Sequence, residues 1–217
     1  MKTEYDVIVV GGGAAGFFTA LNIKESNPNT EVLILERTKE VLSKVKVSGG
    51  GRCNVTHAEF IPSELVTNYP RGAKELLGPF HKFMTGDTMS WFEKHGIELK
   101  IEDDGRIFPV SDSSQTIIDC FLKLAKRYNI QLLTKTPVKT INFKNNKWDL
   151  DTPSSSFVTK SLVMATGSNT KVWNLMKELG HNIINPVPSL FTFNCKDQRI
   201  VNLPGVVVKN VSVEVID

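Results

Sequence analysis

Residues 5–36 constrain the fold of this chain more than any other part of its sequence. Residues 5–10 (YDVIVV) are a β-branched apolar run without alternation, which is typical of a strand buried on both faces of a parallel sheet. Glycines follow at once, and residues 14–25 then repeat small and apolar residues at helical spacing. Residues 31–35 (EVLIL) form a second apolar run, so the segment predicts a βαβ unit.

Three glycines lie between the first strand and the helix of this unit. Gly11, Gly13 and Gly16 form the pattern G-x-G-x-x-G, in which the first permits a tight turn, the second lets a pyrophosphate approach the backbone, and the third lets helix and strand pack closely. Glu36, at the end of the second strand, can accept hydrogen bonds from a ribose. Its carboxylate would repel a ribose 2′-phosphate, although the positive charge of the neighbouring Arg37 weakens that repulsion. The pattern predicts a dinucleotide site without separating FAD from NAD.

The rest of the chain adds further elements to this unit. We expect helices over residues 73–84 and 87–95, a hairpin over 97–110 that turns at Asp103 to Gly105, and a helix from Asp112 or Ser113 to about Tyr128. A short strand (IQLL) follows, then a small antiparallel meander over 138–151 and a buried strand over 157–164. A helix over 171–179 precedes a β-rich tail, whose alternating end (VSVEVID) favours the interpretation that the chain is a fragment.

Composition excludes several classes of protein. With 41% hydrophobic and 23% charged residues the chain can bury a core, and its net charge of +3 comes from scattered basic residues rather than from a nucleic-acid-binding stripe. Cys53, Cys120 and Cys195 form no C-x-x-C pair, and no His, Cys, Asp and Glu group suggests a metal site. We therefore expect a protein of the reducing cytoplasm with no membrane span and without nucleic acid as a partner.

The stretch KVSGGGRCNVTH, residues 46–57, allows several interpretations. It is no P-loop, because no Gly-Lys-Ser/Thr follows, and a flexible linker is a poor fit to Arg, Cys and Asn in succession. A reactive Cys53 activated by Arg52 remains an alternative. Three consecutive glycines suit a backbone that passes close to a flat or anionic ligand, so a cofactor pocket explains the stretch best. Asp104, Gly105, Arg106 and Phe108 can either face a ligand or simply form the hairpin turn.

Four stretches carry a resemblance to a known family: VIVVGGGAAG, KVKVSGGGRCNVTH, DGRIFPVSDSSQTIIDCF, and LVMATG followed by ELGHNIINPVPSL. In their order and spacing the chain resembles the NAD(P)/FAD-dependent oxidoreductases of the HI0933/YhiN/BaiN type. One departure is the sequence after the ATG, where many members have a glycine-rich run and this chain reads ATGSNTKVWNLMKELGH. This variant leaves the substrate side and the approach of a nicotinamide open.

The resemblance implies an α/β fold: a Rossmann-like FAD-binding domain of the glutathione reductase type, with a parallel sheet and a small antiparallel meander. It implies that residues 1–185 form this domain and that residues 186–217 begin an inserted β-rich domain that is cut short. It also implies which residues bind the cofactor. These are Gly11, Gly12, Gly13, Ala14, Ala15, Gly16, Glu36, Arg37, Lys44, Ser48, Gly49, Gly50, Gly51, Arg52, Cys53, Asn54, Thr56, Val138 (through its backbone), Ala165, Thr166 and Gly167.

The leading functional hypothesis is an FAD-dependent oxidoreductase that uses NAD(P)H or a small organic substrate. Two alternatives remain: an NAD-binding Rossmann dehydrogenase, and a flavoprotein with a role in RNA modification or assembly. No residue stands out as the catalytic acid or base, and the oligomeric state is not encoded in any pattern that we could interpret.

Overall fold

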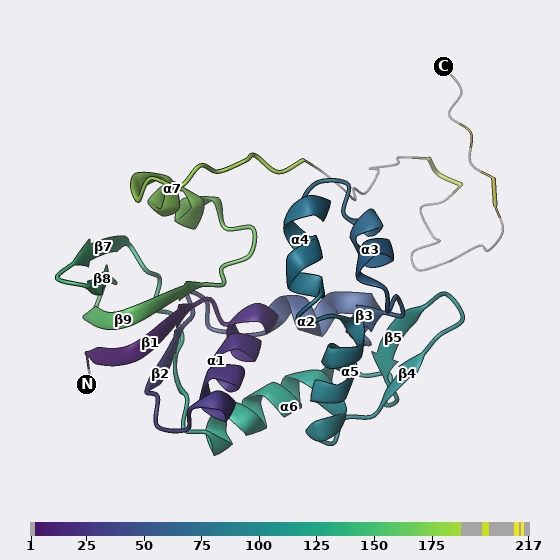
Figure 1. The fold of residues 1–217 in the computed structure, drawn as a ribbon, viewed down its shortest axis with the longest axis horizontal. Coiled ribbons are helices and arrows are strands. Elements are labelled where there is room, and N and C mark those ends of the chain that lie inside the picture. Colours follow the sequence, from purple (N-terminus) through teal and green to yellow (C-terminus); the bar gives the residue numbers. More distant parts are fainter. Residues whose placement is uncertain (1–2, 188–196, 200–210, 213, 215–217) are drawn as a thin grey trace. The chain divides into compact units, whose positions relative to one another are not determined.

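The computed structural model describes residues 3–187, 197–199, 211–212 and 214 (Figure 1). The chain divides into two compact units, Met1–Asn182 and Ile183–Asp217, and every element named below lies in the first. The expected β-rich inserted domain at 186–217 falls mostly outside the described residues. The boundary at 185/186 therefore stays a prediction.

A six-stranded sheet in the order β6-β2-β1-β9-β8-β7 forms the framework of the first unit. Its parallel part contains β1 (Glu4–Val10), β2 (Val32–Leu35), β6 (Gln131–Leu133) and β9 (Ser156–Met164). All four residues of β2 are buried, as the continuous apolar run predicts. The predicted βαβ unit and parallel sheet are confirmed.

The antiparallel part of the same sheet is the predicted meander. Strands β7 (Thr140–Lys144) and β8 (Lys147–Asp151) are joined by Asn145 and Asn146, both with positive φ, as a two-residue hairpin turn requires. Strand β9 has two partners: it pairs antiparallel with β8 over its first residues and parallel with β1 over most of its length. Strand β9 therefore also closes the meander. Only Phe157 and Thr159 of this strand are buried, so the prediction of a fully buried strand over 157–164 is wrong, because its middle residues face solvent.

Helices α1 (Ala14–Ser26) and α6 (Ser114–Arg127) pack side by side against the sheet (Figure 1). Ser113 begins α6, as predicted, and its side-chain oxygen accepts a hydrogen bond from the main-chain nitrogen of Gln115 at 3.3 Å. The apolar face of α6 joins a core cluster that includes Phe17 and Phe121. A second core cluster is formed by side chains of the sheet strands themselves, among them Tyr5, Ile8, Leu33, Leu150 and Phe157.

A smaller antiparallel sheet has the order β3-β5-β4, from β3 (Thr56–His57), β4 (Leu99–Ile101) and β5 (Arg106–Pro109). Strands β4 and β5 form the predicted hairpin, in which Gly105 has φ +80° and donates from its main-chain nitrogen to the oxygen of Glu102. Strand β3 was not predicted, because two residues within an irregular segment show no period. It joins residues 56–57 to the hairpin.

The remaining helices are short. They are α2 (Ser43–Val47), the 3₁₀ turns Ser48–Gly51 and Val66–Asn68, α3 (Pro62–Leu65), α4 (Ala73–Phe80), α5 (Thr85–Lys94) and α7 (Thr170–Glu178). The predicted helix over 73–84 is too long, because Met84 is extended and starts α5. Asp87 is the third helical residue rather than the first, and its carboxylate accepts from the nitrogen of Met84 at 2.9 Å. Among the described residues, no helix is long and apolar enough to cross a bilayer.

Candidate functional site

Two of the three pattern glycines are required by contacts within the protein backbone. Gly11 has φ +117°, and a Cβ atom there would lie 2.3 Å from the carbonyl oxygen of Ala165. A Cβ atom on Gly16 would lie 1.9 Å from the carbonyl oxygen of Gly11. Any side chain at either position would force β1, α1 and the end of β9 apart.

Gly13 differs from these two glycines, because the space beside it is empty. No atom lies within 4 Å of a Cβ built there, and its φ of −93° is one that any residue adopts. Gly13 begins α1 without any side-chain hydrogen bond to the helix, and Ala14 and Ala15 are exposed. The positive end of the helix dipole therefore faces open space in which an anion can approach the main-chain nitrogens.

Glu36 ends β2 beside this glycine turn. One carboxylate oxygen accepts a hydrogen bond from the main-chain nitrogen of Gly12 at 2.8 Å, and the other accepts from the nitrogen and hydroxyl of Thr38, both at 2.8 Å. The side chain of Arg37, the next residue, is exposed. The nitrogen of Thr136 donates to the carbonyl of Glu36 at 2.8 Å, which brings the segment before Val138 next to it.

The glycine segment Ser48–Gly51 is a 3₁₀ turn with an unusual backbone. Gly49, Gly50 and Gly51 have φ of +57°, +69° and +90°. A Cβ on Gly49 would lie 2.7 Å from Cε1 of Phe108, whereas Gly50 has no atom within 4 Å and Gly51 has only one at 4.0 Å. Gly49 is thus required by its packing against Phe108, whereas no other atom of the protein packs closely against Gly50 or Gly51.

Arg52 contacts the β4–β5 hairpin. Its guanidinium carbon lies 3.9 Å from the centre of the Phe108 ring, and its nitrogens bond both carboxylate oxygens of Glu102, at 2.5 and 3.4 Å. Neighbouring Glu102, and more weakly Asp112, raise the pKa of Arg52. Phe108 is fully buried and Arg106 pairs with Asp104, so the hairpin explanation of these residues is the better one.

Cys53, Asn54 and Thr56 follow as parts of the same loop. Cys53 is buried, and burial raises the pKa of its thiol to about 11, which argues against the reactive-thiol alternative. The side-chain oxygen of Asn54 accepts from the nitrogen of Ile107 at 3.3 Å. The hydroxyl of Thr56 lies 3.4 Å from that of buried Thr85. These side chains connect the loop to β5 and α5.

Residues 165–167, which follow β9, lie beside the glycine turn. The nitrogen of Ala165 donates to the carbonyl of Val10 at 2.8 Å, and Gly167 has φ +57°. The ammonium group of Lys44, on α2, donates to the hydroxyl of Ser168 at 3.2 Å. The segment is therefore held between β1 and α2.

A pocket of about 440 Å³ joins the two glycine segments. Six of the predicted residues line it, and they come from α1, α2 and the loop that follows: Ala14, Ala15, Lys44, Ser48, Cys53 and Asn54. Most of the lining is apolar, and its other members were not predicted: Phe18, Val45, Val55, Phe83, Thr88, Phe92, Ile117 and Phe121. A helical pattern contains Phe18, Phe92 and Phe121, but such a pattern does not indicate that a cavity lies beside them.

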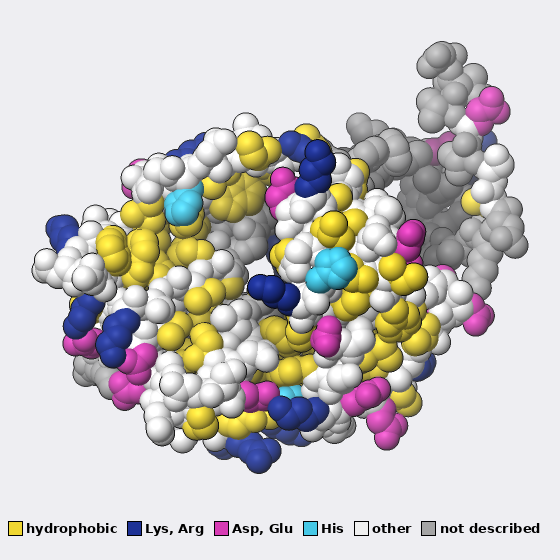
Figure 2. All heavy atoms as spheres, in the orientation of Figure 1, with side chains coloured by type: hydrophobic (Ala, Val, Ile, Leu, Met, Phe, Trp, Pro, Cys, Tyr) yellow, Lys and Arg dark blue, Asp and Glu magenta, His cyan; other side chains and the backbone are white. Residues whose placement is uncertain are grey.

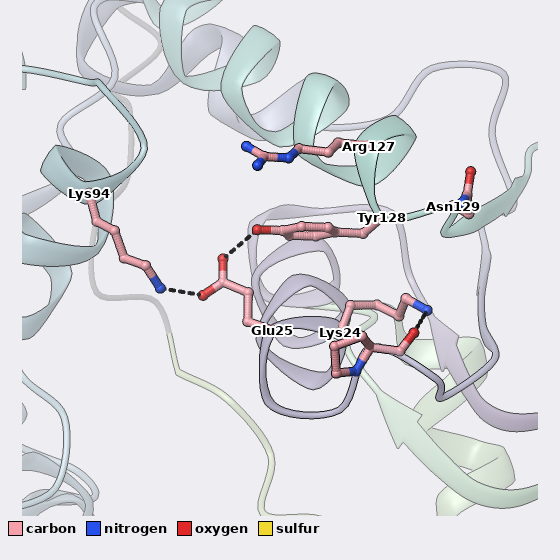
Figure 3. Close-up of a pocket in the computed structure, with 7 residues that line it drawn as sticks. Lys24, Glu25, Lys94, Arg127, Tyr128 and Asn129 are labelled. Carbon is pink, nitrogen blue, oxygen red and sulfur yellow. Dashed lines mark hydrogen bonds and ion pairs between the residues drawn. The ribbon is translucent and has the colours of Figure 1, made fainter.

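A second pocket, of about 430 Å³, lies where the C-terminal ends of α1, α5 and α6 meet (Figure 3). The carboxylate of Glu25 accepts from Lys94 at 3.1 Å and from the hydroxyl of Tyr128 at 3.3 Å, and Nε2 of His95 lies 2.8 Å from it. Lys94 and Arg127 stand in the last turns of their helices, where cations offset the negative helix ends. No residue of the predicted site lines this pocket.

Charged side chains are mixed in sign on the face of the molecule that Figure 2 draws. Figure 2 shows lysine and arginine side chains dispersed among acidic ones on the face in view rather than gathered into a stripe. Within the part of the chain that the structure describes, no group of three or more His, Cys, Asp or Glu residues could hold a metal ion.

Two curated proteins are similar to this chain in sequence. The chain is 24% identical over 206 residues to the 3-dehydro-bile acid delta(4,6)-reductase of Clostridium scindens, a match that covers 91% of this chain and 49% of the relative. It is 28% identical over 164 residues to the ribosomal RNA dihydrouridine synthase of Escherichia coli, covering 76% and 40%. The chain thus spans about half the length of the curated relatives it matches.

Among solved structures, the 3-ketosteroid-delta4-(5alpha)-dehydrogenase of Rhodococcus jostii RHA1 is similar in fold, with a TM-score of 0.55 and 13% identity over 77% of this chain and 46% of that one. The model of the HI0933-like protein Rossmann domain matches residues 5–217. The resemblance carried by the four stretches is confirmed, and the chain belongs to the HI0933-like Rossmann-domain family.

Proposed function

We propose that this chain forms the FAD-binding part of a flavoprotein oxidoreductase. The observation that carries the proposal is the pocket, which brings the start of α1 and the loop 48–54 to one place although the two are far apart in the sequence. Bare backbone at Gly13, Gly50 and Gly51 borders this region. A pyrophosphate and a flat ring need such close backbone approach.

In this proposal, the start of α1 holds the pyrophosphate, and Glu36 accepts from the adenosine ribose through the lone pair that remains on the oxygen bonded to Gly12. Val138 contacts the adenine region through its backbone, which the bond between Thr136 and Glu36 supports. Residues 165–167 close over the cofactor. Residues 1–185 form the FAD domain, and residues 186–217 begin the inserted one.

Bound FAD would supply the redox chemistry, and NAD(P)H is the proposed electron donor. The names of the two relatives describe a reductase and a dihydro-nucleoside synthase, both of which add hydrogen to a carbon–carbon double bond. We propose the same reaction class here. The dispersed basic residues favour a small organic substrate, and the dihydrouridine synthase name makes ribosomal RNA the second candidate.

Titration of the purified protein with FAD tests the proposal. We expect the visible spectrum of bound flavin to appear and NADH or NADPH to bleach it in the absence of oxygen. A 3-keto steroid acid with conjugated double bonds and an unmodified ribosomal RNA should then be compared as oxidants of the bleached protein. A protein that takes up NAD but no FAD would contradict the proposal and favour the dehydrogenase alternative.

A further inference from the structure

We propose that Glu102, on the β4–β5 hairpin, is a positioning residue for the cofactor, acting through Arg52 on the glycine segment Ser48–Gly51. The inference rests on the proposed function, because it assumes that this segment contacts FAD. It assigns a role to a residue that lies outside every predicted cofactor contact.

The glycine segment needs an external support. Three consecutive glycines have the greatest backbone freedom that a chain can have, and ordering them costs conformational entropy. Within the loop, the 3₁₀ turn and the main-chain bond from Cys53 to Ser48 at 2.9 Å restrain the segment, whereas the bond from Arg52 to Gly49 is long, at 3.4 Å. Contacts outside the loop therefore add to what holds Gly50 and Gly51 in place.

Phe108 supplies the first outside contact. Its ring is fully buried, and its edge lies so close to Gly49 that no Cβ fits between them. The guanidinium of Arg52 stacks 3.9 Å from the centre of the same ring. Gly49 and Arg52 bracket the two bare glycines, so both ends of the segment rest on one aromatic side chain.

Glu102 fixes the orientation of Arg52 on that ring. The carboxylate binds the guanidinium with two hydrogen bonds, and both side chains are about 30% exposed, at 32% for Arg52 and 27% for Glu102. Glu102 is itself held in the hairpin, since its nitrogen donates to the carbonyl of Arg106 and its carbonyl accepts from Gly105. A two-point contact holds a planar group in one orientation, which a single charge does not.

Asp112 contributes less to this arrangement. Its carboxylate lies 3.5 Å from Arg52 and is bound more closely by Lys100, which lowers the pKa of Asp112. Glu102 is therefore the partner that sets where the guanidinium lies. Loss of its carboxylate should leave Arg52 on the surface of Phe108 but free to turn, and the glycine segment free to shift.

The test is a double-mutant cycle of Glu102→Gln and Arg52→Ala, read by FAD titration and by the visible circular dichroism of the bound flavin. We expect Glu102→Gln to weaken FAD binding by roughly 5- to 30-fold and to change the dichroism, which reports the surroundings of the ring. In the Arg52→Ala background the same change should have no further effect. Glu4→Gln, which removes a carboxylate that pairs with Lys147 at the start of β1, is the matched control and should alter neither readout.

The unfolding temperature of each variant without FAD separates positioning from folding. Wild-type affinity and dichroism in Glu102→Gln would overturn the inference, and so would an effect of Glu102→Gln that persists without Arg52. If the wild type binds no FAD, the proposed function fails first. If the wild type binds FAD and Glu102→Gln has the same affinity and dichroism, the proposed function stands and only the positioning role of Glu102 is refuted.

Discussion

The main-chain nitrogen of Gly12 donates a 2.8 Å hydrogen bond to the carboxylate of Glu36. The bond ties the glycine turn at the start of α1 to the end of β2. Glu36 therefore shapes the glycine turn, and in the proposed complex it also offers its remaining lone pair to the ribose.

Replacing Glu36 by alanine should weaken FAD binding on the order of 10- to 100-fold, because hydrogen bonds to a charged group contribute about 1.5–3 kcal/mol. Isothermal titration of the protein with FAD measures the change. Glu40→Ala removes an exposed carboxylate four residues later and serves as the control. Equal affinities of wild type and Glu36→Ala would mean that the ribose lies elsewhere.

The thiol of Cys53 should react slowly. Burial raises its pKa to about 11, so at pH 8 the thiolate fraction should be roughly 100-fold below that of a thiol with the ordinary value of about 9. The rate of alkylation, followed on the Cys53 peptide by mass spectrometry, should rise about tenfold per pH unit until the pH approaches 11. A fast, pH-independent reaction at neutral pH would revive the reactive-thiol hypothesis.

The raised pKa of Cys53 also affects stability. Between about pH 9 and 11 the unfolded chain loses this proton while the folded chain keeps it, so the free energy of unfolding should fall over that window. Cys120, whose pKa burial also raises to about 11, acts in the same direction. In Cys53→Ala the decline should be shallower, and urea titrations at pH 8 and 10.5 compare the two slopes.

Glu25→Ala should lower the unfolding temperature and leave FAD affinity unchanged. The variant removes the carboxylate that Lys94, His95 and Tyr128 surround where three helix ends meet. The expected loss is about 1–3 kcal/mol, because His95 and Tyr128 are left without their partner. Differential scanning calorimetry with and without FAD distinguishes the outcomes. Weaker FAD binding in Glu25→Ala would place the second pocket in the functional site.

Local patterns predicted much of this fold, and contacts distant in sequence account for what they missed. The βαβ unit was predicted almost to its ends, because residues that are adjacent in the sequence determine the buried strands and the glycine turn. The contact of Arg52 with Glu102 joins residues fifty positions apart, and no periodicity encodes it. Likewise, helical patterns contain Phe18 and Phe121, but only the packing of α1 against α6 shows that both line a cavity.

The affinity of Gly13→Val for FAD is the decisive measurement for a cofactor bound at the start of α1. Gly13 has an ordinary backbone conformation and empty space around it, so valine there should change the unfolding temperature of the FAD-free protein little. Gly16→Val is the contrasting variant, and it should destabilise the fold because its Cβ meets the carbonyl of Gly11. We expect Gly13→Val to fold normally and to lose at least about 100-fold in FAD affinity, since the side chain would occupy the proposed pyrophosphate position. A well-folded Gly13→Val that binds FAD like the wild type would contradict it.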